Sequence, residues 1–131
     1  MIKLTLNKGI QFIAEDEHNH KIVVDTNKDL GGFDQGFRPM DLFLVAQAGC
    51  MGMDIAYILK KKGGRIDKFE IFIQGQRAQK HPKRYEKIIV KFMCEGDYKR
   101  QDLIRSFELS RDKYCGVTAT LKDCPEFEFI I

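Results

Sequence analysis

The sequence predicts an α+β fold built as a single domain over residues 1–131. Three observations support this class. Short runs near the start alternate polar and apolar residues, a long apolar segment of helical length begins at Pro39, and two further strand-like runs precede a second helical pattern. A hydrophobic fraction of 44% is enough to build one core in a chain of this size.

The first third of the chain is expected to form strands. Residues 2–6, 10–14 and 21–26 have strand patterns, and a polar turn at residues 15–20 joins the last two. The glycine-containing connection that follows, residues 27–38, is too irregular for a phosphate-binding loop. We therefore expect no nucleotide or other cofactor.

The next element is a long helix, expected from Pro39 to about residue 62. Proline favours the first helical turn, Asp41 complements the dipole there, and Gly63 and Gly64 end the helix. Its first two-thirds are apolar on every side, which is typical of a helix that is buried all round. Because so short a chain has little material to surround it, we infer that a second subunit covers part of this helix.

The second half alternates strands and helices. Residues 69–76 and 88–94 are predicted strands, the latter apolar enough to be central. Helices are expected at residues 100–109 and 115–121, and the alternation of residues 127–131 predicts a strand that closes a sheet.

Composition and motifs exclude several classes of function. The net charge of +3 is mild and the lysines are scattered, so no nucleic acid partner is expected. The start has no signal-peptide pattern, and the apolar run 42–53, interrupted by Gln47, falls short of the ~18 residues that span a bilayer. We expect a cytoplasmic protein with no membrane association. His18 and His20 have no evident third ligand, and no Cys-x-x-Cys pair exists, so no metal site is expected.

Two of the four cysteines stand in unusual settings. Cys50 lies within the long apolar helix, and Cys115 stands where a short helix begins, a position that favours a thiolate. Together they suggest a redox pair, although each is also compatible with simple packing of a small apolar side chain. Cys94 and Cys124 are interpreted as packing residues.

Several segments together resemble a known family. They are Arg38-Pro39-Met40-Asp41-Leu42, Ala48-Gly49-Cys50 with Asp54, Gly75-Gln76-Arg77, Leu109-Ser110, and Lys113-Tyr114-Cys115-Gly116-Val117. With them the chain resembles the OsmC/Ohr family of thiol-dependent hydroperoxide reductases over nearly its whole length. The resemblance implies an intertwined homodimer in which two central helices pack against strongly bent antiparallel sheets.

The resemblance also implies roles for residues. Cys50 would be the thiolate that reduces an organic hydroperoxide or hydrogen peroxide in oxidative-stress defence, and Cys115 would resolve its sulfenic acid as a Cys50–Cys115 disulfide. An external dithiol would then reduce that disulfide. The apolar tail of the hydroperoxide is expected against Phe37, Phe43 and Met53.

The chain departs from the family pattern at the groups that activate the thiolate. Met40 stands where the family has a glutamate, and no arginine precedes Asp25 to pair with it. Arg38 and Asp41 are the candidate replacements beside the Cys50 helix. The departures leave a second hypothesis open, namely a non-catalytic dimer of the same fold that binds a small molecule or senses redox state.

Overall fold

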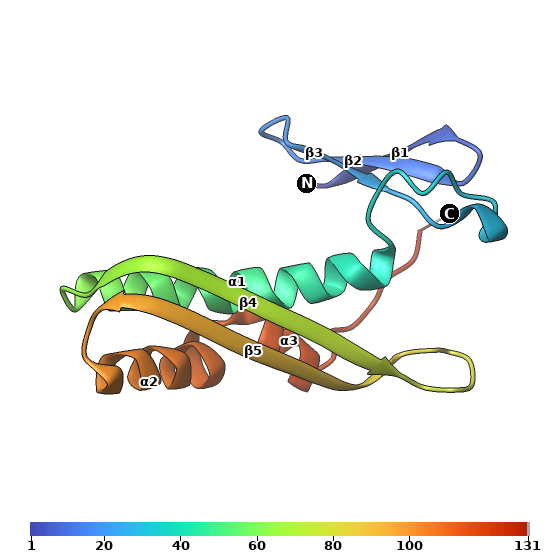
Figure 1. Ribbon diagram of the computed structural model, residues 1–131. Coiled ribbons are helices and arrows are strands. Elements are labelled where there is room, and N and C mark those ends of the chain that lie inside the picture. Colours follow the sequence, from blue (N-terminus) through green and yellow to red (C-terminus); the bar gives the residue numbers. More distant parts are fainter. Residues whose placement is uncertain (131) are drawn as a thin grey trace. The chain divides into compact units, whose positions relative to one another are not determined.

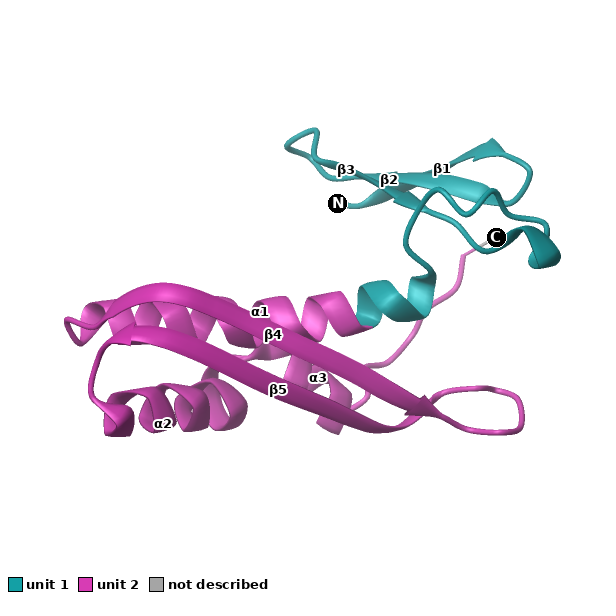
Figure 2. Cartoon of the chain, in the orientation of Figure 1, with its two compact units in different colours: residues 1–43 teal, residues 44–131 magenta. Residues whose placement is uncertain are grey.

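The computed structural model describes residues 1–130. These residues form three α-helices and five strands, together with two short helical turns called η1 and η2 here; Figure 1 labels the helices and strands. The chain divides into two compact units, residues 1–43 and 44–131, which are coloured separately in Figure 2. Each unit is described in turn.

The first unit contains a three-stranded antiparallel sheet in the order β1-β2-β3. Its strands are β1 (Lys3–Lys8), β2 (Gln11–Glu15) and β3 (Lys21–Val24). Gly9 has a φ of +54° at the turn between β1 and β2, and Asn19 has a φ of +65° at the turn between β2 and β3. Glycine and asparagine tolerate this left-handed region better than other residues, which explains why the sheet turns there.

A carboxylate organises the connection that follows β3. Asp25 is buried, and its oxygens accept hydrogen bonds from the side chain of Gln11 at 2.8 Å and from the backbone N–H groups of Thr26 at 2.8 Å, Phe33 at 3.2 Å and Gln35 at 3.1 Å. The turn η1 (Lys28–Leu30) lies within the loop so fixed. An irregular loop thereby finds partners for its backbone donors without a strand ladder.

The second unit is built on helix α1 (Pro39–Lys61), whose first residues, up to Phe43, belong to the first unit. Figure 1 shows α1 running beside strand β4 (Arg65–Arg77). The two elements approach closely at Gly52, where an added Cβ would stand 2.5 Å from Cδ1 of Ile71. A glycine at this position therefore allows helix and strand to pack closely.

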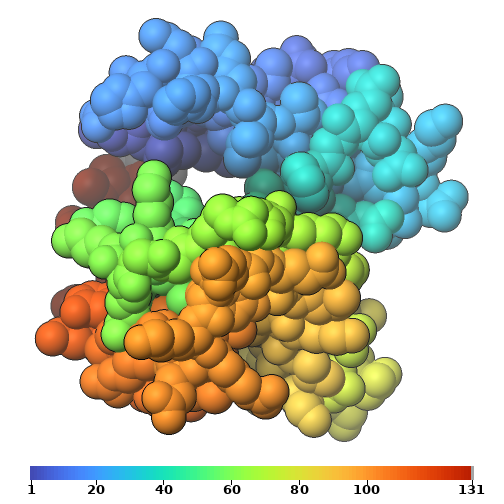
Figure 3. Space-filling view, turned by 60° about the vertical axis from the view of Figure 1, so that its left-hand side comes forward, coloured from blue at the N-terminus to red at the C-terminus, as the bar shows by residue number. Residues whose placement is uncertain are grey.

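Strand β4 pairs with β5 (Tyr85–Asp97) as a long antiparallel hairpin. Irregularities in the ladder fall near both ends, between Ile66 and Lys68 and between Gln76 and Arg77. In the space-filling view the yellow-green residues of β4 adjoin the yellow-orange residues of β5 (Figure 3). The hairpin is thus one continuous surface on which the helices of this unit pack.

The remaining elements follow β5 closely. Helix α2 (Arg100–Leu109) packs through Phe107, whose ring meets that of Phe92 on β5 edge to face at 5.5 Å between centroids. The wide helical turn η2 (Ser110–Tyr114) continues α2, and α3 (Gly116–Lys122) comes next. Lys62 at the end of α1 donates to Asp102 of α2 at 2.8 Å, which ties the two helices at that end.

The structure confirms most of the elements expected from the sequence. The three N-terminal strands, the helix from Pro39, both later strands and both later helices are present, although β4 and β5 are longer than expected. The strand expected at residues 127–131 is wrong for residues 127–130, and residue 131 lies outside the described residues. Residues 127–130 form no strand with the rest of the described chain, and Phe127 and Phe129 are 66% and 85% exposed.

Helix α1 is buried on one side only within the single chain. Met51, Ile55 and Leu59 are buried, whereas Met53 and Tyr57 are exposed. In length and composition α1 also meets the requirement for crossing a membrane, a requirement that the core helix of a soluble protein meets equally. The prediction of no membrane association stays a prediction, and so does the single domain.

The Asp25 network predicts a specific dependence of stability on pH. Burial alone would raise the pKa of Asp25, but hydrogen bonds from Gln11 and from three backbone N–H groups lower it from 3.8 to about 2. A carboxyl group whose pKa is lower in the folded chain than in the unfolded chain stabilises the fold at pH values above its unfolded-state pKa. This stabilisation is lost as the pH falls through the folded-state pKa. Between these two pH values, the free energy of unfolding of wild type, measured with urea, should fall as the pH is lowered. Asp25→Asn should be less stable than wild type at neutral pH, and its free energy of unfolding should fall much less over the same range.

The exposed Asp29 in η1 offers a matched control. Asp29→Asn should keep the wild-type pH profile, because that carboxylate accepts none of the hydrogen bonds described for Asp25. A decline in Asp25→Asn as steep as that of wild type would contradict the assignment.

The contact of α1 with β4 predicts a coupling between Gly52 and Ile71. Replacing glycine by alanine inside a helix stabilises it by about 1 kcal/mol, but at Gly52 the added methyl group displaces Cδ1 of Ile71. Gly52→Ala should therefore stabilise an Ile71→Val background, which lacks that methyl group, by at least ~0.5 kcal/mol more than it stabilises wild type. Chemical denaturation of the four proteins measures this difference, and equal effects in both backgrounds would contradict the contact.

Candidate functional site

The structure brings Cys50 and Cys115 together. Cys50 is half-buried in the middle of α1, and Cys115, which is 3% exposed, precedes α3. The two thiols lie close enough for a hydrogen bond between them to change both of their pKa values, and repulsion by Cys115 also raises the pKa of Cys50. Both cysteines belong to the second unit, and together they form the candidate site.

Local backbone geometry explains the position of Cys115. The turn η2 ends where the N–H of Cys115 donates to the carbonyl of Ser110 at 2.9 Å, and Cys115 then adopts an extended conformation. Its sulfur accepts a hydrogen bond from the backbone N–H of Thr118 at 3.3 Å. The side chain therefore caps α3, in the role that serine or aspartate usually has.

The environment of each thiol moves its pKa in a different direction. Burial, the hydrogen bond with Cys115 and repulsion by Asp54 raise the pKa of Cys50, and one hydrogen bond from the Val117 backbone opposes them. Burial also acts to raise the pKa of Cys115, but hydrogen bonds from Cys50, Thr118 and Val117 outweigh it and lower that pKa overall. When the pair has lost one proton, the negative charge is therefore favoured on Cys115, and the two thiols titrate as a unit.

A carboxylate and a hydroxyl hold one side of the pair. Asp54 lies one helical turn after Cys50 on α1, and its Oδ2 accepts a hydrogen bond at 2.9 Å from the hydroxyl of Ser110, which is fully buried. This bond ties α1 to η2 just before Cys115. Asp54 also lines a hollow of about 330 Å³ together with residues of α1, α2 and η2, which are Tyr57, Ile58, Lys61, Lys62, Leu109 and Tyr114.

An amide and a second hydroxyl hold the other side. Gln47, one turn before Cys50, is 6% exposed, and its Nε2 donates to Oγ1 of Thr118 at 2.7 Å. Its Oε1 is buried and has no hydrogen-bond partner among the described residues 1–130. Leaving a buried acceptor unpaired costs roughly 1–3 kcal/mol, so this oxygen is an exception within a well-paired site.

The sequence contained signals for some of these neighbours beyond the cysteine motifs. Gln47 is the one polar side chain in the apolar run 42–53, which marks it for a specific partner rather than for packing. Asp54 and Ser110 stood in the segments that carry the family resemblance, without a role. Thr118 offered no signal, because a threonine in the first turn of a short helix is ordinary.

Other expected site residues lie elsewhere. Phe37, Arg38, Asp41 and Phe43 belong to the first unit, and Met53 lies in the second and is 76% exposed. Arg38 and Asp41 are exposed, and neither forms an ion pair with another of residues 1–130. Their roles around Cys50 stay predictions.

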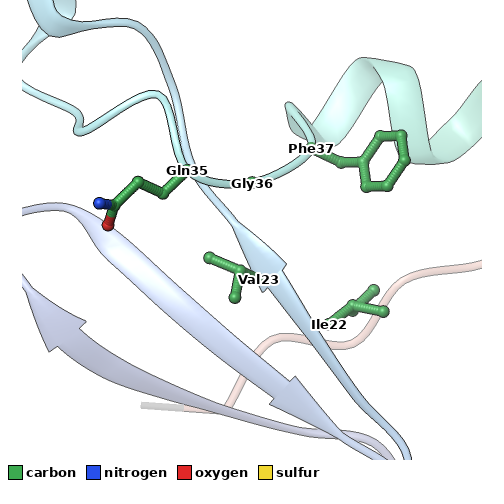
Figure 4. A pocket seen from close by; sticks show the side chains of 5 residues that line it. All are labelled: Ile22, Val23, Gln35, Gly36 and Phe37. Carbon is green, nitrogen blue, oxygen red and sulfur yellow. The ribbon is translucent and has the colours of Figure 1, made fainter.

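Phe37 contributes to a hollow within the first unit. Its N–H donates to the carbonyl of Val23 at 3.1 Å, so the segment before α1 lies along β3. Figure 4 shows the side chains of Ile22 and Val23 on β3 beside this segment. The hollow has a volume of about 420 Å³ and is lined by Ile22, Val23, Gln35, Gly36 and Phe37.

Two basic residues near the N-terminal turn, Lys21 and His20, have acidic neighbours within their own hairpin. Lys21 Nζ is 3.4 Å from Glu15 Oε1, and His20 Nδ1 is 2.8 Å from Asp16 Oδ2. Residues 1–130 contain no group of three or more His, Cys, Asp or Glu side chains arranged to hold a metal ion.

The repulsion between Asp54 and Cys50 predicts a shift in reactivity with pH. In a Cys115→Ser background, Asp54→Asn should lower the pH midpoint for alkylation of Cys50, because removing a negative charge favours the thiolate. Iodoacetamide labelling at a series of pH values, read by peptide mass spectrometry, measures the midpoint. Ser110→Ala is the control, since it removes the hydrogen bond but keeps the carboxylate, and should shift the midpoint less. An unchanged midpoint in Asp54→Asn would show that the carboxylate does not act on the thiol.

Comparisons with known proteins agree on the family. Protein YhfA of Escherichia coli (strain K12) is 29% identical over 116 residues, which are 88% of this chain and 84% of that protein. A hypothetical protein from Aquifex aeolicus VF5 has a crystal structure with a TM-score of 0.82 and 33% identity, covering 95% of this chain and 87% of that one.

A more distant structure shares the fold alone. It is that of an organic hydroperoxide resistance protein OsmC from Legionella pneumophila, with a TM-score of 0.65 and 12% identity, covering 94% of this chain and 88% of that one. The model of the family described as OsmC-like protein matches residues 32–129, a span that includes both cysteines and the residues around them. The chain therefore belongs to the OsmC-like protein family.

Proposed function

We propose that this protein is a thiol-dependent peroxidase that reduces organic hydroperoxides or hydrogen peroxide in the cytoplasm. The observation that carries the proposal is the close pair of Cys50 and Cys115, whose side chains interact with each other between the Gln47–Thr118 and Ser110–Asp54 hydrogen bonds. The name of the Legionella pneumophila structure, an organic hydroperoxide resistance protein, supports the choice of substrate class.

The proposed chemistry starts at Cys50, because its sulfur is the less buried of the two. With Cys115 protonated, the Cys50 thiolate attacks the terminal oxygen of the hydroperoxide. The S–O bond forms, the O–O bond breaks, and the alkoxide leaves with the proton of the Cys115 thiol. The Cys115 thiolate then attacks the Cys50 sulfur, the S–S bond forms, the S–O bond of the sulfenic acid breaks, and hydroxide leaves to the solvent, where the buffer protonates it. An external dithiol of the cell reduces the disulfide by exchange.

The proposed working form is a homodimer. Several apolar side chains of α1 and of the C-terminal segment are uncovered in the single chain, among them Val45, Met53, Phe127 and Phe129. Apart from its chain neighbours and the backbone of its own helix, no atom of the described residues lies within 4 Å of the place where a Cβ on Gly49, next to Cys50, would stand. Burying apolar surface is favourable at roughly 25 cal/mol per Å², so a second copy that covers these side chains would be stabilised by doing so.

The prediction from this proposal concerns the fate of each thiol. After one equivalent of cumene hydroperoxide, intact-protein mass spectrometry should show that wild type loses two hydrogens. Cys115→Ser should accumulate a sulfenic acid on Cys50, and Cys50→Ser should lose nearly all fast oxidation, because the accessible nucleophile is gone.

A matched control is a protein with both Cys94→Ser and Cys124→Ser. Neither residue belongs to the pair, since Cys94 lies in β5 and Cys124 is exposed after α3, so this protein should react as wild type does. Full reactivity of Cys50→Ser would overturn the proposal. Absence of fast oxidation in wild type would favour a dimer that binds a small molecule without turnover, and oxidation that no dithiol reverses would favour a redox sensor.

A further inference from the structure

The side chain of Gln47 has a hydrogen-bonding capacity that the fold does not use. It lies in a helix turn that is otherwise apolar, and it is 6% exposed. One end of its carboxamide donates to Thr118, and the other end, Oε1, has no partner among residues 1–130. Buried polar atoms are nearly always paired in native proteins, so an exception beside a reactive group calls for a functional explanation.

The network fixes which way the carboxamide points. The backbone N–H of Thr118 donates to the sulfur of Cys115 at 3.3 Å, and a hydrogen bond from the Thr118 side chain also acts to lower the pKa of Cys115. The hydroxyl oxygen is then left to accept from Nε2 of Gln47, as the 2.7 Å contact shows. The carboxamide therefore cannot turn over without losing this chain of bonds, and Oε1 is held as an acceptor.

Gln47 also stands on the side of α1 that carries Cys50. The two residues are three apart, which places their side chains on neighbouring turns of one helix face. Thr118, the partner of Gln47, bonds to Cys115, and Cys115 interacts with Cys50. The acceptor thus belongs to the same cluster as the two sulfurs.

We propose, on the basis of the peroxidase function above, that Oε1 of Gln47 accepts a hydrogen bond from the O–H group of the hydroperoxide and thereby positions it for attack by Cys50. The hydrogen atom concerned never leaves its oxygen. The attacked oxygen carries it in the hydroperoxide and still carries it in the Cys50 sulfenic acid, while the O–O bond breaks and the alkoxide departs. One fixed acceptor therefore serves both the substrate and the intermediate.

The test compares two electrophiles in the full-length chain with Cys94→Ser and Cys124→Ser, which keeps the reactive pair. Cumene hydroperoxide carries an O–H group, whereas methyl methanethiosulfonate has neither an O–H nor an N–H group to donate. The rate constant of Cys50 with each reagent is measured by quenching and peptide mass spectrometry. The ratio of the two rate constants removes any common change in thiolate content or accessibility.

Gln47→Met keeps the length of the side chain and removes the acceptor. We expect its ratio of hydroperoxide to thiosulfonate rate constants to fall about tenfold, the effect of losing roughly one hydrogen bond. Gln47→Leu should give the same ratio and guards against a local effect of methionine. Both also lose the hydrogen bond from Nε2 to Thr118, as Gln47→Glu does, so the comparison with Gln47→Glu isolates the loss of the acceptor.

Gln47→Glu retains an acceptor oxygen, and its ratio should return toward the wild-type value whatever its effect on the thiol pKa. Two results would overturn the role of Gln47 without contradicting the proposed peroxidase function. One is an equal fall of both rate constants in Gln47→Met, and the other is a Gln47→Glu ratio as low as that of Gln47→Met. A wild-type protein that reacts with the thiosulfonate but not with the hydroperoxide would overturn both.

Discussion

Two side-chain hydrogen bonds across α1 hold the cysteine pair together. Thr118 accepts from Gln47 across 71 residues of sequence, and Ser110 donates to Asp54 across 56. On α1 these contacts bracket Cys50, one turn before it and one turn after it, and on the other segment they bracket Cys115. The partners follow one another in opposite order along the two segments, so the segments run antiparallel past each other at the cysteines. These two bonds fix the two segments beside each other, which the cysteines alone, as small side chains, would do only weakly.

The elements of the fold could be predicted from the sequence where the local pattern decides the structure. The helix from Pro39 has a proline start, a glycine end and an unbroken apolar run, and it forms as expected. The C-terminal segment has an equally clear alternation at residues 127–130 and forms no strand. An alternating pattern indicates that one face of the segment is apolar and favours burial. A strand also needs the edge of a sheet with which it can form hydrogen bonds, and the sequence of the segment does not show whether such an edge is available.

The candidate site was predictable in its reactive atoms and not in its surroundings. Cys50 and Cys115 stood out because cysteine is rare and reactive, and the structure brings both to one place. The pairing of Gln47 with Thr118 depends on the angle at which α3 meets α1, and no spacing along the chain encodes that angle. The sequence likewise could not show that a carboxylate, Asp54, would oppose the thiolate that the family resemblance assigns to Cys50.

The opposite shifts of the two thiols give the proposed cycle a direction. A thiol of higher pKa forms less thiolate, but each thiolate is a stronger nucleophile, whereas a thiol of lower pKa is the better leaving group in disulfide exchange. In a disulfide between Cys50 and Cys115, an incoming dithiol meets the more accessible sulfur, Cys50, and expels Cys115, the better leaving group. The mixed disulfide with the reductant would thus form at Cys50. Cys115 would be released as a thiolate, and would cap α3 again, before Cys50 is freed.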